Sequence, residues 1–132
     1  MSVVADASVV VAWLVDDGDD GRWAEEVLAI GAIAAPHLMP AEVASTLRRR
    51  VLSGRLAPEI AALALEDLQQ ASFDLFPYEP FAQRVWELRE TVTPYDAWYV
   101  AMGEALDAPV ASLDARLTRA PGPRCRFLTP VD

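Results

Sequence analysis

Short apolar runs alternate with longer amphipathic segments along the chain. The apolar runs are typical of short buried strands, and they lie at residues 3–5, 32–35, 73–76, 109–112 and 126–128. The segments between them carry apolar side chains at helical spacing, at residues 20–30, 41–54, 59–71, 80–90 and 95–106. Three of these segments follow a proline, which is common at the start of a helix. The alternation predicts an α/β fold in which helices cover both faces of a parallel sheet.

Composition indicates how many domains the chain forms and where in the cell it is expected. The 132 residues are 53% hydrophobic, which predicts one ordered domain with its own core. The amino-terminal apolar run is short, lacks a basic leader and is interrupted by Asp6, so it resembles neither a signal peptide nor a membrane span. With one cysteine and no signal, we expect a cytoplasmic protein.

Charge excludes several kinds of chemistry. The chain has 11 basic and 20 acidic residues, a net charge of −9, and every basic residue is an arginine. Without lysine there is no Walker-type phosphate loop and no Schiff base. A single cysteine, Cys125, and a single histidine, His37, exclude an internal disulfide, a cysteine zinc cluster and a multi-histidine metal site. The groups that remain available for binding or catalysis are carboxylates, arginines, hydroxyls and backbone groups.

Four acids occupy special positions in the predicted layout. Asp6 ends the first strand and Asp114 follows the fourth, where open parallel sheets bind their ligands. Glu42 and Asp96 each lie two residues after a proline, in the first turn of a predicted helix. Capping alone would explain a first-turn acid, and Thr93 with Asp96 fits a capping box. The helices of both acids are largely apolar, however, and a buried carboxylate needs a partner or a cation.

A divalent metal is the simplest partner for these carboxylates, because lysine is absent and the arginines cluster elsewhere. A site made of carboxylate oxygens selects Mg²⁺ or Mn²⁺, with Ca²⁺ as an alternative. Such sites support hydrolysis of phosphate esters.

Four segments, taken together, resemble the PIN-domain family and, within it, the VapC-type toxins of type II toxin–antitoxin pairs. They read VVADAS, PHLMPAEVASTLRRR, TPYDAWYVAMGEAL and SLDARL. Their order and spacing match the family over nearly the whole chain. The resemblance implies a single PIN domain spanning 1–132, built as a PIN-like three-layer α/β/α sandwich with a central parallel sheet of four to five short strands.

The resemblance also implies a site. The four family acids fall on Asp6, Glu42, Asp96 and Asp114, and supporting hydroxyl groups fall on Ser8 and Ser112. By this reading Asp6, Asp96 and Asp114 bind metal directly, and Glu42 is a further ligand or positions water. The chain departs from the family at Ser45, where asparagine is common.

The implied activity is that of an endoribonuclease dependent on Mg²⁺, with Mn²⁺ able to substitute. Metal-activated water would hydrolyse RNA phosphodiesters and leave 5′-phosphate and 3′-hydroxyl ends. The implied partners are RNA, a cognate VapB-type antitoxin and a second copy of the chain, with no membrane. Of the arginines, Arg116 is the best placed to contact substrate, because it closely follows Asp114. The acidic balance predicts weak long-range attraction to RNA and suits an arginine-bearing antitoxin segment.

The same residues allow other interpretations. A catalytically silent metal-binding module and a DNA-directed PIN nuclease share the same acids. A phosphatase or a receiver domain is less consistent, since both usually need a lysine. The run 48–50 is a solvated helix face or a set of phosphate contacts, and the leucine-rich stripe at 56–68 is core or a groove for an antitoxin helix. Core or interface packing is the expected role of the four tryptophans, and Cys125 reads as an incidental thiol despite its arginine neighbours.

Overall fold

The first strand of the chain lies at the centre of a five-stranded sheet. The structure is a computed structural model that describes residues 1–130, with the strand order β3-β2-β1-β4-β5. The strands are β1 (Ser2–Ala5), β2 (Ala32–Pro36), β3 (Phe73–Phe76), β4 (Val110–Ala111) and β5 (Phe127–Leu128). Every neighbouring pair is parallel, so all five strands end at the same edge of the sheet. The predicted parallel sheet is confirmed.

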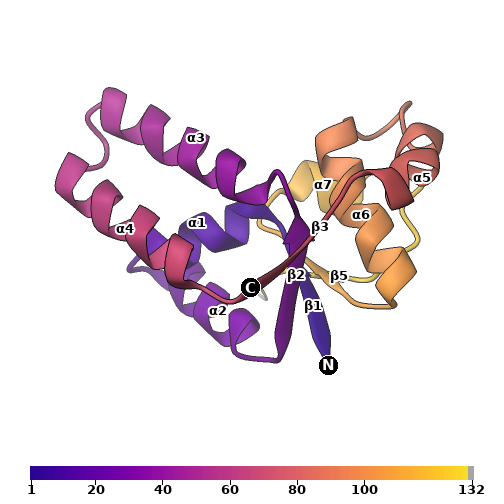
Figure 1. The fold of residues 1–132 in the computed structure, drawn as a ribbon, viewed down its shortest axis with the longest axis horizontal. Helices are drawn as coiled ribbons and strands as arrows, with labels where there is room; N and C mark the ends of the chain where they lie inside the picture. Colours follow the sequence, from indigo (N-terminus) through magenta and orange to yellow (C-terminus); the bar gives the residue numbers. More distant parts are fainter. Residues whose placement is uncertain (131–132) are drawn as a thin grey trace.

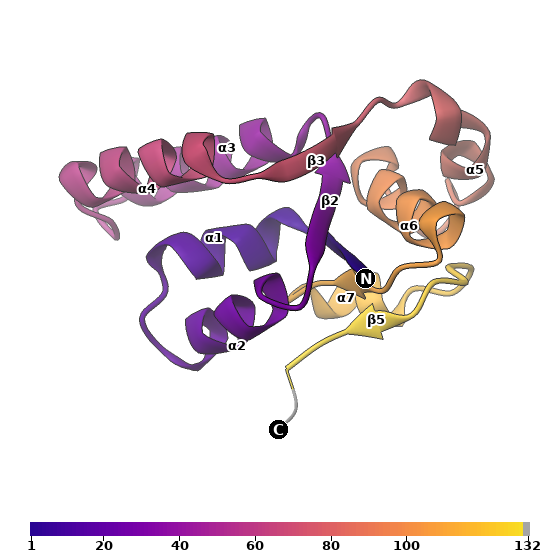
Figure 2. The same cartoon turned by 60° about the horizontal axis from the view of Figure 1, so that its bottom comes forward.

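Helices form the outer layers. They are α1 (Ala7–Val15), α2 (Asp19–Leu28), α3 (Met39–Leu52), α4 (Pro58–Gln70), α5 (Ala82–Glu87), α6 (Pro94–Leu106) and α7 (Ala115–Arg119), with a 3₁₀ turn η1 (Glu79–Phe81) before α5. Figure 1 shows α1 and α2 on one side of the strands and α5 and α6 on the other. Helices α3 and α4 lie side by side as a hairpin that extends away from the sheet in both views (Figures 1 and 2). The three-layer α/β/α prediction is therefore confirmed.

Two helices, α1 and α7, were not predicted from the sequence. Helix α1 reads ASVVVAWLV and has no polar face, because it packs against α2, α3 and α4 as well as lying over the sheet. Its valines also favour strand over helix when taken alone. Helix α7 has only five residues, too few to show a helical period.

Helix α6 is the main element on its side of the sheet. Residues 97–103 are all buried, and Tyr99 and Val100 have no exposed surface. Gly103 lets this helix approach β4, since a Cβ built there would stand 2.5 Å from Val110 Cγ2. The close approach fixes the position of α6 relative to the strand ends.

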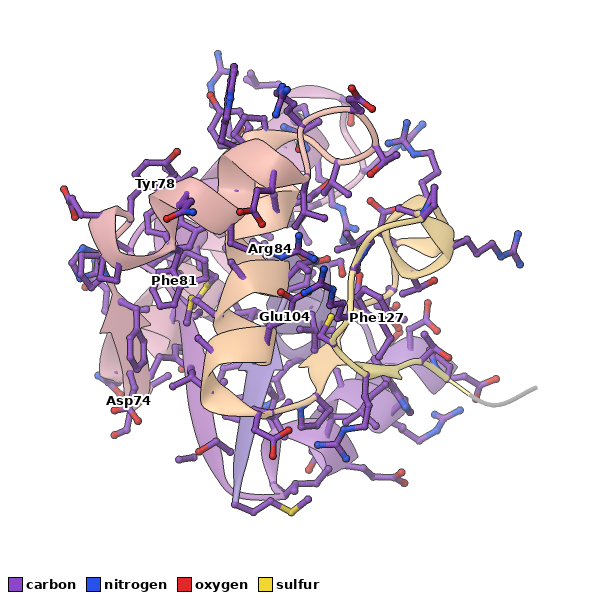
Figure 3. The ribbon with its side chains drawn as sticks, turned by 90° about the vertical axis from the view of Figure 1, so that its right-hand side faces the viewer. Asp74, Tyr78, Phe81, Arg84, Glu104 and Phe127 are labelled. Carbon is purple, nitrogen blue, oxygen red and sulfur yellow. The ribbon has the colours of Figure 1, made fainter. Side chains whose placement is uncertain are left out.

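An ion pair holds the segment between α7 and β5 against α6. Arg84 on α5 donates from Nε and Nη2 to Glu104 on α6, at 2.7 Å and 3.1 Å, as the two labelled side chains show in Figure 3. Glu104 also accepts from the backbone N–H of Arg124, and Arg84 donates to the carbonyl of Gly122. Burial would raise the pKa of Glu104, but the bonds from Arg84 and Arg124 outweigh it and lower that pKa. The segment between α7 and β5 is thus held against α6.

None of the helices within residues 1–130 combines the length and the apolar composition that crossing a bilayer requires.

Candidate active site

The site lies where the chain crosses from one half of the sheet to the other. Strand β1 pairs with β2 on one side and β4 on the other, and Asp6 and Ser112 directly follow β1 and β4. Open parallel sheets form a crevice at such a position, outside the carboxyl ends of the strands. The backbone N–H of Asp6 donates to the carbonyl of Ala111 at 3.0 Å, so the two strand ends are held together.

Asp6 is the most buried acid of the site, with a relative exposure of 6%. Its Oδ2 accepts two hydroxyl hydrogen bonds, from Ser8 and from Ser112, both at 2.8 Å. The serines are held in turn, because Ser8 Oγ accepts the N–H of Leu113 and Ser112 Oγ accepts the N–H of Asp114, each at 3.0 Å. The two serines therefore lock the Asp6 carboxylate onto the loop that follows β4.

Asp114 ends that loop and begins α7. Its Oδ1 accepts the backbone N–H of Arg116 at 2.9 Å, which makes Asp114 the N-cap of the helix. The Arg116 guanidinium is 96% exposed and its Nε lies 4.0 Å from the same oxygen. The Arg116 side chain is therefore exposed at the rim of the site, next to the Asp114 carboxylate.

Glu42 and Asp96 stand in the first turns of α3 and α6, and Asp96 lines the crevice. The Asp96 backbone N–H donates to Thr93 Oγ1 at 3.3 Å, so the capping expected at this position is present. That bond uses the amide of Asp96 and leaves its carboxylate to the crevice. Glu42 Oε1 accepts a 2.7 Å hydrogen bond from the hydroxyl of Tyr99, one turn after Asp96 on α6.

Burial and mutual repulsion raise the pKa of three of these carboxyls. Burial is the main cause for Asp6, partly offset by its two serine hydrogen bonds. Burial also raises the pKa of Glu42, and the charges of Asp6 and Asp96 raise it further. The pKa of Asp96 rises to about 6 through burial and the charges of Asp6 and Asp114. Carboxylates that repel one another in a partly buried crevice are a site for a cation.

The residues present fit a hard divalent ion, because every donor is a carboxylate or hydroxyl oxygen. Within residues 1–130, no three acidic, histidine or cysteine side chains already stand close enough to form one ion's ligand shell.

The crevice opens on two sides that differ in charge. One opening is lined by Asp96 and Asp114 together with Thr93 and Arg116. The other is lined by Asp6, Asp96 and Asp114 together with Asp16, Asp20, Thr46 and Arg50. The acidic side chains of residues 16–20, at the end of α1 and the start of α2, are exposed, and Asp16 and Asp20 contribute to the wall of this second opening.

The remaining candidates fall outside the carboxylate cluster or at its edge. Arg48 and Arg49 are exposed, as a solvated face requires, whereas Arg50 is half-buried and lines the second opening. Ser45 is exposed and accepts a hydrogen bond from Arg49 at 3.1 Å, so the departure from the family lies on the surface of α3. His37 is exposed in the turn after β2.

Three further expectations can be compared with the structure. Burial raises the pKa of Cys125 to about 11, which excludes an activated thiol. Of the tryptophans, Trp98 is buried, whereas Trp86 is 65% exposed beside the Arg89 guanidinium. The stripe at 56–68 divides, with Leu68 in the core and Leu63 60% exposed.

Sequence reasoning missed two groups of residues. Because Trp98 and Tyr99 closely follow Asp96, one of them is expected at the rim of the crevice; in the structure Tyr99 is buried, and its hydrogen bond to Glu42 is what the sequence does not reveal. Its position three residues after Asp96 places both on one face of α6, which is the signal that could have revealed it. Asp16, Asp20 and Arg50 reach the crevice through the packing of α1, α2 and α3, which the sequence pattern does not contain.

Comparisons with known proteins identify the family of the chain. The pattern of the PIN domain family matches residues 3–123. Ribonuclease VapC1 of Mycobacterium tuberculosis is 41% identical over 125 residues, covering 94% of each chain. Ribonuclease VapC9 of the same species is 33% identical over 123 residues, covering 93% of this chain and 94% of that protein.

The fold comparison points the same way. The crystal structure of VapBC2 from Rickettsia felis, bound to a DNA fragment from its promoter, contains a chain that superposes with a TM-score of 0.69 at 16% identity. The superposition covers 99% of this chain and 100% of that one. With the family pattern over most of its length and relatives this similar, the chain belongs to the PIN domain family, in the group of the VapC ribonucleases.

Proposed function

We propose that this protein is a metal-dependent endoribonuclease and the toxin of a toxin–antitoxin pair, acting in the cytoplasm. The observation that carries the proposal is that Asp6, Asp96 and Asp114 line one opening at the carboxyl edge of the sheet, with Glu42 within electrostatic reach of Asp6 and Asp96. The identity to VapC1, whose name describes it as a ribonuclease, supports RNA as the substrate.

Mg²⁺, or Mn²⁺ in its place, is the proposed cofactor. Asp6, Asp96 and Asp114 would hold it directly, with Glu42 as a further ligand or as the group that positions water. When bound, such an ion lowers the pKa of water and stabilises the charge on the phosphate and the leaving oxygen. No side-chain nucleophile is required.

The protein's own groups prepare this site. Ser8 and Ser112 fix the Asp6 carboxylate, and the N-cap bond to the Arg116 amide fixes Asp114. Arg116, at the rim of the first opening, is the proposed contact for a phosphate of the RNA backbone.

Cleavage of a radiolabelled RNA pool by the purified protein tests this function. We expect cleavage with Mg²⁺ or Mn²⁺, its loss with EDTA, and a loss of at least about 100-fold in Asp96→Asn, because a ligand that also carries catalytic charge is removed. Asp74→Asn is the matched control, since Asp74 is an exposed aspartate on the outer strand β3, labelled in Figure 3.

Three outcomes would redirect the assignment. Wild-type cleavage by Asp96→Asn contradicts the carboxylate site. Mn²⁺ binding in titration calorimetry without cleavage of any RNA supports the silent module. Faster cleavage of DNA than of RNA of the same sequence supports the DNA-directed nuclease.

A VapB-type antitoxin is the proposed protein partner, as the likeness to VapBC2 suggests. An apolar cleft between α3, α4 and β3, lined in part by Ala44, Leu65 and Leu68, fits an amphipathic helix. The acidic second opening fits a basic side chain of the same partner. A homodimer is also proposed.

The salt dependence of antitoxin binding distinguishes a contact at the apolar cleft from one at the acidic second opening. We expect the Kd of the complex to rise with salt, and Asp16→Asn with Asp20→Asn to reduce that dependence. An affinity that is insensitive to salt contradicts the acidic contact. Light scattering of the isolated protein tests the homodimer, and a monomer at micromolar concentration contradicts it.

A further inference from the structure

The phenol of Tyr99 is an unusual group to find inside this core. The side chain has no exposed surface and lies in a run of buried residues, 97–103, whose other side chains are apolar or absent. A buried hydroxyl needs a hydrogen-bond partner, and this one donates to Glu42 Oε1 at 2.7 Å. Phenylalanine would fill the same space without that requirement, so packing alone does not explain the hydroxyl.

The hydrogen bond connects two helices that lie on either side of the strands. Glu42 stands on α3 and Tyr99 on α6, 57 residues apart in the chain, and Figure 1 shows these helices to the two sides of the sheet. Asp96 lies one turn before Tyr99 on the same face of α6. The phenol therefore fixes the Glu42 carboxylate relative to α6, the helix that carries Asp96.

The bond also selects between the two oxygens of Glu42. Oε1 is occupied by the phenol, whereas Oε2 has no hydrogen-bond partner among residues 1–130. The charges of Asp6 and Asp96 both raise the pKa of this carboxylate, so both acids are within electrostatic reach of it. A carboxylate fixed through one oxygen presents the other in a defined direction, as partners of metal ligands commonly do.

We propose that Tyr99 is a positioning residue, whose hydroxyl holds Glu42 so that Oε2 faces the carboxylates of Asp6 and Asp96. The proposal rests on the proposed function, because it assigns Glu42 to the metal site. It adds a residue that touches neither substrate nor metal and acts only through Glu42.

Binding of Mn²⁺ to the purified protein, measured by calorimetry without RNA, tests the proposal. We expect Tyr99→Phe to weaken Mn²⁺ binding about tenfold, in the range found when partners of metal ligands are removed. Tyr78→Phe is the matched control: it also removes one phenol oxygen, and Tyr78 is 40% exposed with its ring against Trp98. Equal affinities of Tyr99→Phe and the wild type overturn the proposal.

A double-mutant cycle separates positioning from general structural damage. In the Glu42→Gln background, Tyr99→Phe should cause little further loss of Mn²⁺ affinity, because the group on which it acts is already changed. Fully additive losses overturn the proposal. If the wild type itself binds no Mn²⁺, the proposed function fails, and that result is distinct from a failure of Tyr99 alone.

A measurement on the wild-type sequence covers the case in which Tyr99→Phe does not fold. The chain has 3 tyrosines, so labelling with 3-fluorotyrosine gives few resonances, which Tyr78→Phe and Tyr95→Phe assign. The Tyr99 signal should shift when Mg²⁺ is added, since its acceptor is the proposed ligand, whereas the Tyr78 signal should stay. An unchanged Tyr99 signal at saturating Mg²⁺ overturns the proposal.

Discussion

Asp96 combines a capped backbone with an unsatisfied charge. Its amide is satisfied by Thr93, while its carboxyl is half-buried beside Asp6 and Asp114 and has a pKa of about 6 against an ordinary 3.8. The folded protein therefore holds this proton more tightly than the unfolded chain. Ionisation of Asp96 then costs folding free energy, and the cost disappears as the pH falls through about 6 toward 3.8.

The pH dependence of stability should show this cost. Without metal, we expect the Tm of the wild type to rise between pH 7.5 and pH 5, and Asp96→Asn to show a smaller rise. At pH 7.5 the variant should be more stable by about 1–2 kcal/mol, less than the full shift implies because the carboxyl is partly exposed. Thermal unfolding with EDTA checks this, with Asp74→Asn controlling for net charge. The same pH dependence in wild type and Asp96→Asn would contradict it.

The acids could be predicted because each stands at a position with a sequence signal. Asp6 follows an apolar strand, and Glu42 and Asp96 follow prolines that begin helices. The serines that hold Asp6 were expected from the family resemblance, whereas the hydrogen bond that holds Glu42 was not. Tyr99 has the composition of a core residue, and its hydrogen bond to Glu42 depends on how α3 and α6 are placed in three dimensions.

At the scale of elements, α6 supplies both a carboxylate and the support for another. Its depth in the core depends on Gly103, the only position of this helix without a Cβ. An added Cβ would meet Val110 Cγ2 at 2.5 Å, the Ala108 carbonyl at 3.1 Å and Cys125 Cβ at 3.2 Å. Val110 is fully buried and β-branched, so it has little freedom to move away.

Gly103→Ala should therefore destabilise the protein by about 1–3 kcal/mol, although alanine is the better helix former. Urea unfolding measures the change. Ala105→Gly, at an exposed position of the same helix, calibrates helix propensity and should cost about 1 kcal/mol. A Gly103→Ala protein as stable as the wild type would show that α6 and β4 can separate without cost.

Burial explains why the longer of the two helices that the sequence did not predict was missed. Helix α1 is enclosed by other helices and by the sheet, so its sequence has lost the polar stripe by which helices are found. Strands β4 and β5 are predicted in place but shorten to two residues each. The strand order is also absent from the local pattern, because it depends on which crossover packs on which face.

For the whole molecule, the negative net charge affects how substrate can be bound. The net charge is −9, and two divalent ions would bring it to −5, so the molecule does not attract RNA from a distance. Binding must depend on short-range contacts at the first opening, where Arg116 is 96% exposed.

We expect a weak salt dependence for the KM of RNA cleavage at fixed Mg²⁺. Arg116→Ala should raise KM several-fold. It should also lower the slope of log KM against log salt concentration by about 1, the value for one phosphate contact. Arg55→Ala, an exposed arginine between α3 and α4, is the control and should leave both unchanged. An unaltered slope in Arg116→Ala would remove Arg116 from the substrate contacts.

The central position of β1 has a consequence for the order in which the protein is synthesised. The first strand made pairs with β2 early, but its other edge waits for β4, and Asp6 lacks the Ser112 hydroxyl until that strand arrives 106 residues later. A nascent chain that ends before β4 therefore has neither Asp114 nor a fixed Asp6. We therefore expect fragments that end before β4 to lack nuclease activity, because the proposed site is complete only once residues 110–114 have been made.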